Sequence, residues 1–284
     1  MNNDLTGVAF YYINLDRSVD RKKAAEQQAT MHGIELQRVP AVDGRSLKEE
    51  DLTAYARAKR KLEYRTDLSP GEHACILSHM KTLRLFMETD KQYAVILEDD
   101  FVLNPRFTDG INWLVHKTSG WQALKLYTED GKLYHLNKKS DSGDAWELIF
   151  PKKIPWVAVG NIYTRQAAQI ILQSFREYWM GFDTQLAWFL LTQKVPFAGL
   201  TPSLVSTSDP DNQDSTIDDG GNRYEAAPIP PSSPENASAD SPAASTRNKL
   251  TTRQYAQHRL NVWRMAYSKW RMRQILKSKL KVTH

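Results

Sequence analysis

The chain has few of the features that mark disulfide-stabilised, exported or membrane-spanning proteins. Its 284 residues include one cysteine, Cys75, and this excludes an internal disulfide. No basic segment followed by an apolar one opens the sequence, so we expect no export through a signal peptide. No stretch approaches the roughly 18 uninterrupted apolar residues of a membrane span. These absences predict a soluble or peripherally attached cytoplasmic protein.

Acidic residues are missing from the last part of the chain. From Arg247 onward there are 11 Lys or Arg and no Asp or Glu, which leaves 27 basic and 33 acidic residues in 1–246. The net charge of +5 therefore comes from the tail alone. A uniformly basic chain would favour a nucleic-acid partner, but this distribution does not, and we expect none.

Composition divides the chain into three parts. Residues 1–222 contain the apolar runs that a buried core requires. Residues 223–246 are rich in Pro, Ser and Ala and hold almost no large apolar residue, so they predict a flexible linker. Residues 247–284 form the basic tail, in which 255–281 predict an amphipathic helix with Leu260, Trp263, Tyr267 and Trp270 along one stripe.

Hydrophobic patterning in residues 1–222 predicts an α/β fold. The runs at 8–15 and 93–97 are apolar on both faces, as in strands that helices cover on both sides. Strands alternating with helices predict a mostly parallel sheet flanked by helices. Further strands are expected at 123–127, on both sides of Gly131, at 156–163 and at 195–200. Helices are expected at 20–32, at 69–88 with a capping box of Ser69 and Glu72, at 107–117, after Thr164, and at 183–192.

Three consecutive carboxylates, Glu98, Asp99 and Asp100, follow the second apolar run. Open α/β sheets bind ligands at the carboxyl ends of their strands, so this is where a site is expected. Adjacent like charges repel, and a hard divalent cation such as Mg²⁺ or Mn²⁺ would relieve that repulsion. A solvated strand end without a metal is the alternative reading.

An ordered set of segments resembles glycosyltransferase family 25, which includes bacterial lipooligosaccharide galactosyltransferases. The matching segments are Tyr12-Ile-Asn-Leu15 with Asp16, Arg17, Asp20 and Arg21; Ala41-Val-Asp-Gly44; Leu68-Ser-Pro-Gly-Glu-His-Ala-Cys75 with Ser78 and His79; and Ile96-Leu-Glu-Asp-Asp100. The resemblance implies a GT-A type (Rossmann-like) fold, a UDP-sugar donor and a metal that bridges its diphosphate. It further implies transfer of a hexose, with galactose favoured, to a saccharide acceptor in lipooligosaccharide or lipopolysaccharide synthesis.

The resemblance also implies roles for individual residues. The nucleotide pocket would be lined by Ile13, Asn14, Leu15, Arg17, Arg21, Val42, Asp43, Gly44 and Ser78. If the chain stays extended through the triplet, Glu98 and Asp100 point to one side and Asp99 to the other. We then expect Asp100 as a direct metal ligand with Glu98 in support, and Asp99 toward the ribose or donor sugar.

An inverting transfer needs a base, and the resemblance places it at Asp183. Helix capping is the alternative explanation for Asp183. Histidine is absent between His135 and His258, so Asp209, Asp211 or Asp214 are candidates for a further metal ligand. Segments 206–208 and 215–217 are expected to form a loop over the donor, or an ordinary exit to the linker.

The basic tail predicts a peripheral contact with the inner face of an anionic membrane through residues 255–281. Packing on the body or a second subunit, or binding of nucleic acid, are the alternatives for this helix. Membrane attachment suits a lipid-linked oligosaccharide acceptor. Two rival functions remain open at this point: a metal-dependent phosphohydrolase or nucleotidyltransferase, and a catalytically silent glycan- or membrane-binding protein.

Overall fold

The structure is a computed structural model, which describes residues 4–54, 68–128, 136–139, 145–151, 158–178 and 181–208. Only the backbone is described at 136–139, 150–151, 188 and 191–192. The expected linker at 223–246 and the tail at 247–284 lie outside these residues, as do Asp209, Asp211, Asp214 and the segment 215–217. Among the helices that the structure describes, none is both long enough and apolar enough to cross a membrane.

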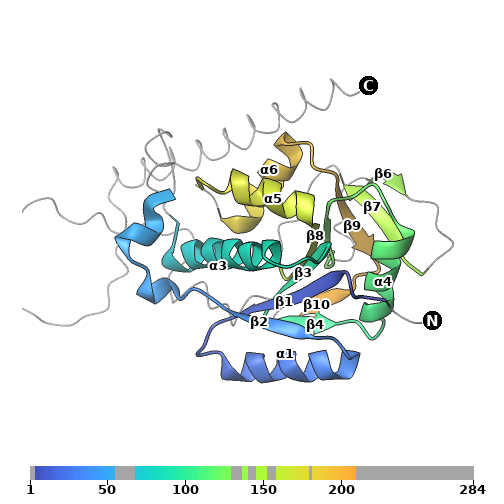
Figure 1. Ribbon diagram of the computed structural model, residues 1–284, viewed down its shortest axis with the longest axis horizontal. Coiled ribbons are helices and arrows are strands. Elements are labelled where there is room, and N and C mark those ends of the chain that lie inside the picture. Colours follow the sequence, from blue (N-terminus) through green and yellow to red (C-terminus); the bar gives the residue numbers. More distant parts are fainter. Residues whose placement is uncertain are drawn as a thin grey trace, which may run out of the picture. The chain divides into compact units, whose positions relative to one another are not determined.

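An eight-stranded mixed sheet forms the centre of the fold (Figure 1). Strands β2, β1 and β3 run parallel, β8 runs antiparallel to both β3 and β5, and β5 and β9 are parallel. β7 is antiparallel to β9 and β6 to β7, so all strands except β8 and β7 point the same way. In sheet order the strands are β2 (Leu36–Pro40), β1 (Val8–Asn14), β3 (Tyr93–Glu98), β8 (Gly160–Thr164), β5 (Ala123–Lys125), β9 (Phe197–Thr201), β7 (Glu147–Pro151) and β6 (Leu136–Lys139).

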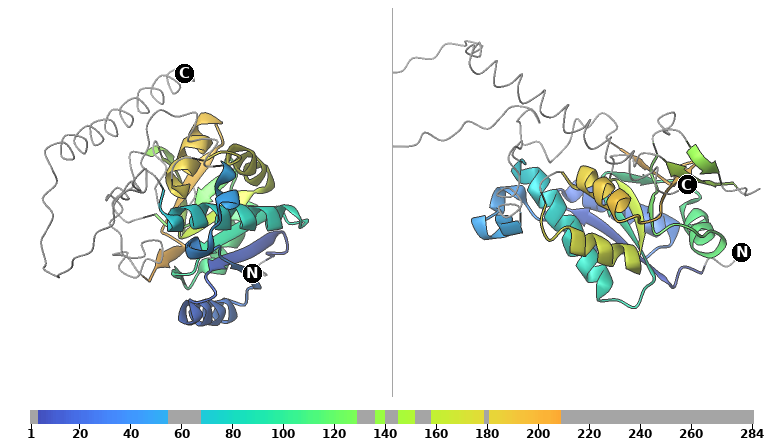
Figure 2. Two further views of the ribbon diagram at one scale, coloured as in Figure 1. Left: turned by 90° about the vertical axis from the view of Figure 1, so that its left-hand side faces the viewer. Right: turned by 90° about the horizontal axis from the view of Figure 1, so that it is seen from above.

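Helices cover both faces of this sheet, as the views in Figures 1 and 2 show. Side chains alternate along β1, so Tyr11 and Ile13 join one core cluster while Phe10 and Tyr12 join the other. The first cluster includes residues of α3 (Pro70–Met87), α5 (Arg165–Ser174) and α6 (Phe182–Thr192). The second includes α1 (Val19–His32), α4 (Phe107–Lys117) and a separate two-stranded ribbon of β4 (Phe101–Leu103) and β10 (Val205–Thr207). The expectation of an α/β core with helices on both faces is confirmed.

Helix α3 begins as its sequence predicts. The Ser69 hydroxyl accepts from the Glu72 backbone N–H at 3.2 Å, and the Glu72 carboxylate accepts from the Ser69 N–H at 2.8 Å. Pro70 occupies the first helical position, where its missing N–H costs nothing. At the other end, Arg165 donates to the carbonyls of Met87, Thr89 and Lys91 at 2.7–3.0 Å. Both ends of α3 are therefore fixed, and with them the positions of the side chains along it.

Several elements differ from the sequence-based expectation. β2, the ribbon of β4 and β10, and the 3₁₀ turns at Gly44–Ser46 and Glu49–Leu52 were not predicted. The segment expected as a loop at 206–208 belongs largely to β10, which pairs antiparallel with β4. The strand expected at 156–163 is observed at Gly160–Thr164, with 156 and 157 outside the described residues.

Candidate active site

The candidate site lies along one edge of the sheet, where several strands end together. β1 ends at Asn14, β3 at Glu98 and β5 at Lys125, and the three strands point in the same direction. Parallel strands with a shared direction bring their carboxyl ends to one edge, the usual location of ligand sites in open α/β sheets. The charged side chains that follow these ends are therefore brought together by the topology.

Asp99 is held between the end of β1 and the first turn of α1. Its two carboxylate oxygens accept separately, one from the Asn14 Nδ2 at 2.7 Å and the other from the Arg21 guanidinium at 2.9 Å. The side chains of Asp99 and Arg21 are 13% and 25% exposed. The structure thus brings together Asn14 and Arg21, expected in the nucleotide pocket, and Asp99, expected toward the ribose or donor sugar.

The Asn14 amide connects four chain segments. Its Nδ2 donates to Asp99 and to the Ser18 carbonyl, while its Oδ1 accepts from the Arg38 Nε at 2.9 Å. Arg38, on the edge strand β2, also donates to the Asp16 carboxylate at 2.6 Å. Asn14 is 1% exposed, so its orientation is fixed by these bonds. Arg38 was not predicted as part of the site.

The segment from Val42 to Gly44 follows β2 and packs against the start of α3. Asp43 forms ion pairs with Arg17 and Arg45, and these contacts, that of Arg45 first, hold its pKa well below the usual range. A Cβ added to Gly44 would lie 2.7 Å from the Pro70 carbonyl carbon, so only glycine fits at this approach.

Ser78 holds the segment from Val42 to Gly44 through a hydrogen bond to its backbone. It is 2% exposed, its hydroxyl accepts from the Val42 N–H at 2.9 Å, and it donates to the Ala74 carbonyl at 2.7 Å. The hydroxyl is therefore used within the protein and positions the Val42 backbone. This placement differs from the direct lining of the pocket that the resemblance implied. Ile13 is 8% exposed and Leu15 partly buried, next to Asn14 at the strand end.

Asp100 does not continue the extended strand, which corrects the expectation for the triplet. β3 ends at Glu98, and residues 99 and 100 form a turn. The Asp100 carboxylate accepts from the Thr207 hydroxyl at 2.6 Å, and its backbone carbonyl accepts from the Ser208 N–H at 2.8 Å. Strand alternation therefore cannot place Asp100 on the same side as Glu98.

Glu98 points toward the helical layer that contains α3. Its Oε1 lies 3.2 Å from the Nε2 of His79, and the imidazole stacks on Phe182 at 3.9 Å between ring centroids. His79 is 1% exposed, whereas the Glu98 side chain is 30% exposed. Glu98 and Asp99 thus diverge to opposite sides of the chain, as alternation predicts.

Asp183 lies in the first turn of α6, directly after Phe182. Burial raises its pKa to about 6, and the negative charge of Glu98 adds to this, while Lys125 and His79 oppose it. The Lys125 ammonium lies 3.4 Å from Asp183 Oδ1. The Lys125 side chain is 1% exposed and the Asp183 side chain 24% exposed. A carboxyl group with a pKa near neutrality and an exposed edge is suited to general base chemistry.

Glu98 and Asp100 offer carboxylate oxygens to the expected cation. Burial, followed by the nearby charge of Glu98, raises the pKa of Asp100, and a bound cation would reverse this effect. Carboxylate oxygens are the ligands that Mg²⁺ and Mn²⁺ prefer. The donor chemistry of Glu98 and Asp100 therefore fits such an ion.

Sequence reasoning missed Lys125 and Arg38, and it placed Thr207 near the donor only as part of an expected loop at 206–208. Lys125 had a visible signal, because it interrupts an apolar run, Ala-Leu-Lys-Leu-Tyr, at residues 123–127. Arg38 had none, since it reaches the site only through the pairing of β2 with β1, and the hydrogen bond of Thr207 to Asp100 depends on the pairing of β10 with β4. Three tryptophans could offer aromatic faces to sugar rings, but Trp156 and Trp179 lie outside the described residues and only the backbone of Trp188 is described.

The family profile and the similar sequences of known proteins all point to one family. The sequence profile of "Glycosyltransferase family 25 (LPS biosynthesis protein)" matches residues 8–185. A "Glycosyltransferase 25 family member" of Anopheles gambiae is 26% identical over 172 residues, 57% of this chain and 28% of that protein. The corresponding Drosophila melanogaster protein is 30% identical over 101 residues, 34% of this chain and 16% of that protein. The chain therefore matches less than a third of the length of these relatives.

Solved structures resemble the chain weakly. A glycosyltransferase involved in glycosylation of the major capsid of PBCV-1 covers 68% of this chain at 10% identity, with 81% of its own length matched and a TM-score of 0.37. A score this low supports no conclusion about function. The family profile spans more than half of the chain and includes all the site residues described up to Asp183. The chain belongs to glycosyltransferase family 25.

Proposed function

We propose that this protein is an inverting hexosyltransferase with a GT-A type fold. It moves a hexose, galactose first, from a UDP-sugar to a saccharide acceptor of lipooligosaccharide, lipopolysaccharide or a similar glycan. The observation that carries the proposal is the divergence of two adjacent carboxylates at the end of β3. Asp99 meets Asn14 and Arg21 on one side of the chain, and Glu98 meets His79 and the surroundings of Asp183 on the other.

The Asp99 side is suited to the donor. Asn14, Arg21 and Asp99 fix one another, and a carboxylate held in this way can accept hydrogen bonds from the hydroxyls of a ribose or hexose. Arg17, paired with Asp43 at 31% exposure, supplies positive charge next to the same segment of chain. Charge of this sign favours an anionic diphosphate.

The Asp183 side is suited to the acceptor. In its ionised form, Asp183 takes the proton of the acceptor hydroxyl as that oxygen attacks the anomeric carbon. Attack comes from the face opposite the diphosphate, so the bond to the phosphate oxygen breaks as the new glycosidic bond forms. UDP departs, the configuration at the anomeric carbon inverts, and the proton remains on Asp183. Lys125 stabilises the ionised carboxylate before the reaction.

Asp100 and Glu98 would hold Mn²⁺ or Mg²⁺. When bound, the cation supplies Lewis-acid neutralisation of the charge that develops on the departing diphosphate. Thr207 orients Asp100 through the hydrogen bond of 2.6 Å. This hydrogen bond also lowers the pKa of Asp100 and so favours the ionised form that binds a cation.

The proposal also includes a location. Residues 255–281 would attach the protein to the inner face of an anionic membrane, where a lipid-linked oligosaccharide acceptor is concentrated. Removal of the basic tail is then expected to leave transfer to a soluble acceptor intact and to weaken transfer to an acceptor in vesicles. Co-sedimentation with anionic and neutral vesicles measures the contact directly.

A panel of UDP-hexoses with Mn²⁺ and short saccharide acceptors tests the activity. We expect a new glycoside by mass spectrometry, inverted at the anomeric carbon by NMR, and lost in the Asp99→Ala and Asp100→Ala variants. Circular dichroism checks that both variants are folded, so that a loss of activity can be assigned to the site. Release of phosphate or pyrophosphate from nucleotides without an acceptor would instead identify a phosphohydrolase or nucleotidyltransferase. Binding of glycans or vesicles without turnover of any donor would identify a silent binding protein.

A further inference from the structure

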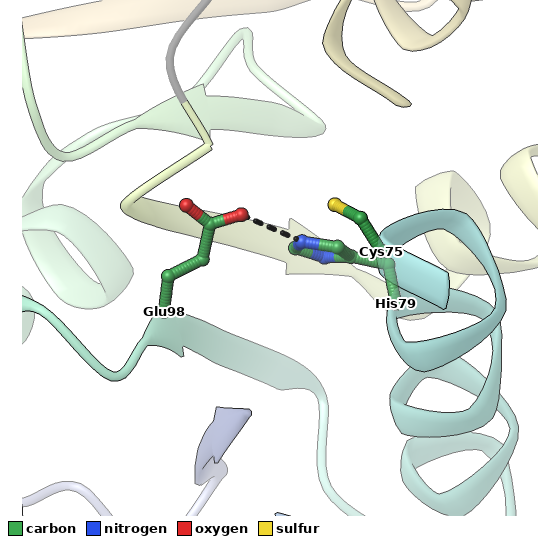
Figure 3. A group of neighbouring side chains, drawn as sticks. All are labelled: Cys75, His79 and Glu98. Atoms are coloured by element: carbon green, nitrogen blue, oxygen red, sulfur yellow. Dashed lines mark hydrogen bonds and ion pairs between the residues drawn. The ribbon is translucent and has the colours of Figure 1, made fainter. Parts of the chain in front are cut away.

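Three side chains of different chemistry meet beside the end of β3. Cys75 and His79 lie four residues apart on α3, and Glu98 ends β3 opposite them (Figure 3). One ligand atom from each, the sulfur, a ring nitrogen and a carboxylate oxygen, lies within 4.8 Å of the other two. Among the residues that the structure describes, this is the group of His, Cys, Asp and Glu whose ligand atoms are close enough to share a metal ion. We call it the α3 cluster.

The spacing of the α3 cluster fits a four-coordinate site. Residues at positions i and i+4 of a helix share one face, and zinc sites use this spacing for pairs of helical ligands. Zinc lies about 2.0–2.1 Å from nitrogen and oxygen ligands, so two such ligands of a tetrahedral ion are about 3.3 Å apart. The observed separation of His79 Nε2 and Glu98 Oε1 is 3.2 Å. The Cys75 sulfur lies within 4.8 Å of these two atoms, and a tetrahedral site would place it about 3.6 Å from each.

The two ring nitrogens of His79 have different surroundings. Nε2 faces Glu98 at 3.2 Å, whereas Nδ1 is buried and has no hydrogen-bond partner among the described residues. An ion at the α3 cluster would therefore bind Nε2, with the proton of the neutral imidazole on Nδ1. Cys75 is partly exposed and Glu98 is 30% exposed, so an ion can reach the α3 cluster from solvent.

We propose that the α3 cluster binds Zn²⁺ through the Cys75 thiolate, the His79 imidazole and the Glu98 carboxylate, with a fourth position open to water. Thiolate and imidazole ligands select Zn²⁺ over Mg²⁺ and Mn²⁺, which prefer carboxylate oxygens. The two proposed sites share Glu98 and differ in their other ligands, a thiolate and an imidazole here and the Asp100 carboxylate there. Binding releases the thiol proton of Cys75 and joins the middle of α3 to the end of β3.

Cobalt replaces zinc in the test because Co²⁺ is coloured. The untagged, full-length chain is reduced with a phosphine and titrated with Co²⁺ in buffer without Mg²⁺ or Mn²⁺, which would compete for Glu98. A thiolate bound to Co²⁺ gives a charge-transfer absorption band, and a four-coordinate ion gives intense visible bands. Because Cys75 is the one cysteine of the 284 residues, any thiolate band comes from it. We expect one Co²⁺ per chain and loss of the bands when Zn²⁺ is added.

Variants identify the ligands. Cys75→Ser should abolish the charge-transfer band and weaken Zn²⁺ binding, measured against a chromophoric chelator, by at least about tenfold. Glu98→Gln keeps the shape of the side chain and should change the visible bands and weaken Zn²⁺ to a similar degree. Asp100→Asn, which removes the proposed donor-site ligand, serves as the control and should leave the bands unchanged.

Two results would overturn the proposal. One is the absence of a charge-transfer band in the reduced wild-type chain while circular dichroism shows that it is folded. The other is a band that survives unchanged in both Glu98→Gln and His79→Gln, because Cys75 would then bind the ion with other partners. Neither result bears on the transferase proposal, which the assay with Mn²⁺ and UDP-sugars tests separately.

Discussion

Lys125 should set the pH at which the proposed transfer reaction begins. Its ammonium group is 1% exposed and lies 3.4 Å from the Asp183 carboxylate, whose pKa is about 6. Replacing Lys125 with Met keeps a side chain of similar length in the core and removes the charge. The pKa of Asp183 should then rise, because the ionised carboxylate loses the cation that favours it.

The size of this effect follows from the distance between the two groups. Two unit charges 3.4 Å apart interact by about 5 kcal/mol at an effective dielectric constant of about 20. Water at the exposed edge of Asp183 screens part of this, so we take about half, which corresponds to about 2 pKa units. The midpoint should move from about 6 to about 8, since the base must be ionised. At about pH 7 the ionised fraction would fall from about nine-tenths to about one-tenth, and kcat/KM by about tenfold.

The assay is a pH profile of kcat/KM for transfer. Wild type should gain activity as the pH rises through about 6, and Lys125→Met through about 8, so that the two converge near about pH 9. Lys125→Arg keeps the positive charge and should retain a midpoint near that of wild type. Lys117→Met, at an exposed position of α4, controls for loss of a lysine elsewhere. An unchanged midpoint in a folded Lys125→Met protein would refute the assignment of Asp183 as a base controlled by Lys125.

Three further predictions concern other parts of the site. Asp183→Asn should lower kcat by about 10²–10⁴-fold with little change in UDP affinity, as steady-state kinetics and calorimetry will show. Asp99→Asn should weaken UDP-sugar binding by at least about tenfold because it loses the charge paired with Arg21, whereas Asp16→Asn, at an 81% exposed carboxylate, should change it less than about twofold. Gly44→Ala should lower the free energy of unfolding by about 1–3 kcal/mol in urea, because its Cβ meets the Pro70 backbone at 2.7 Å. Gly7→Ala, with open space around the added Cβ, is the matched control, and equal stability of the two variants would contradict this reasoning.

Local sequence signals predicted the helices well. Ser69, Pro70 and Glu72 form the capping box and first turn of α3, and Thr164 accepts from the Ala167 N–H at 3.2 Å at the start of α5. These features depend on contacts three residues apart, which a sequence displays directly. The apolar runs that become β1 and β3 were equally clear, because both faces of these strands are covered.

The missed elements depend on contacts far apart in the chain. β2 contains one buried residue, Val39, and its place beside β1 comes from pairing with that strand. β4 and β10 are three residues each and pair across about a hundred residues of sequence. No short-range pattern marks such strands, so the position of Thr207 against Asp100 was not predictable. The Glu98 contact with His79 has the same origin, since it joins a helix to the strand that follows it.

A similar limit applies to the charges of the site. The sequence shows three adjacent carboxylates as one group, but the structure gives each a different neighbour. Asp99 meets a guanidinium, Asp100 a hydroxyl, and Glu98 an imidazole. Alternation along β3 predicted that Glu98 and Asp99 point to opposite sides. It also predicted Asp100 on the side of Glu98, but the chain turns at 99 and 100, so alternation does not extend to Asp100.

The Asn14 amide links Arg38, on the edge strand β2, to Asp99 at the end of β3. Arg38 and Asp99 are hydrogen-bonded to opposite ends of the Asn14 side-chain amide. Arg38 donates to the amide oxygen, and Asp99 accepts from the amide nitrogen. A cation at the oxygen end polarises the amide and makes its N–H a stronger donor. Loss of the Arg38 guanidinium on the edge strand should therefore weaken the hydrogen bond from Asn14 to Asp99. An aspartate in place of the amide would face Asp99 with like charge at the same short separation.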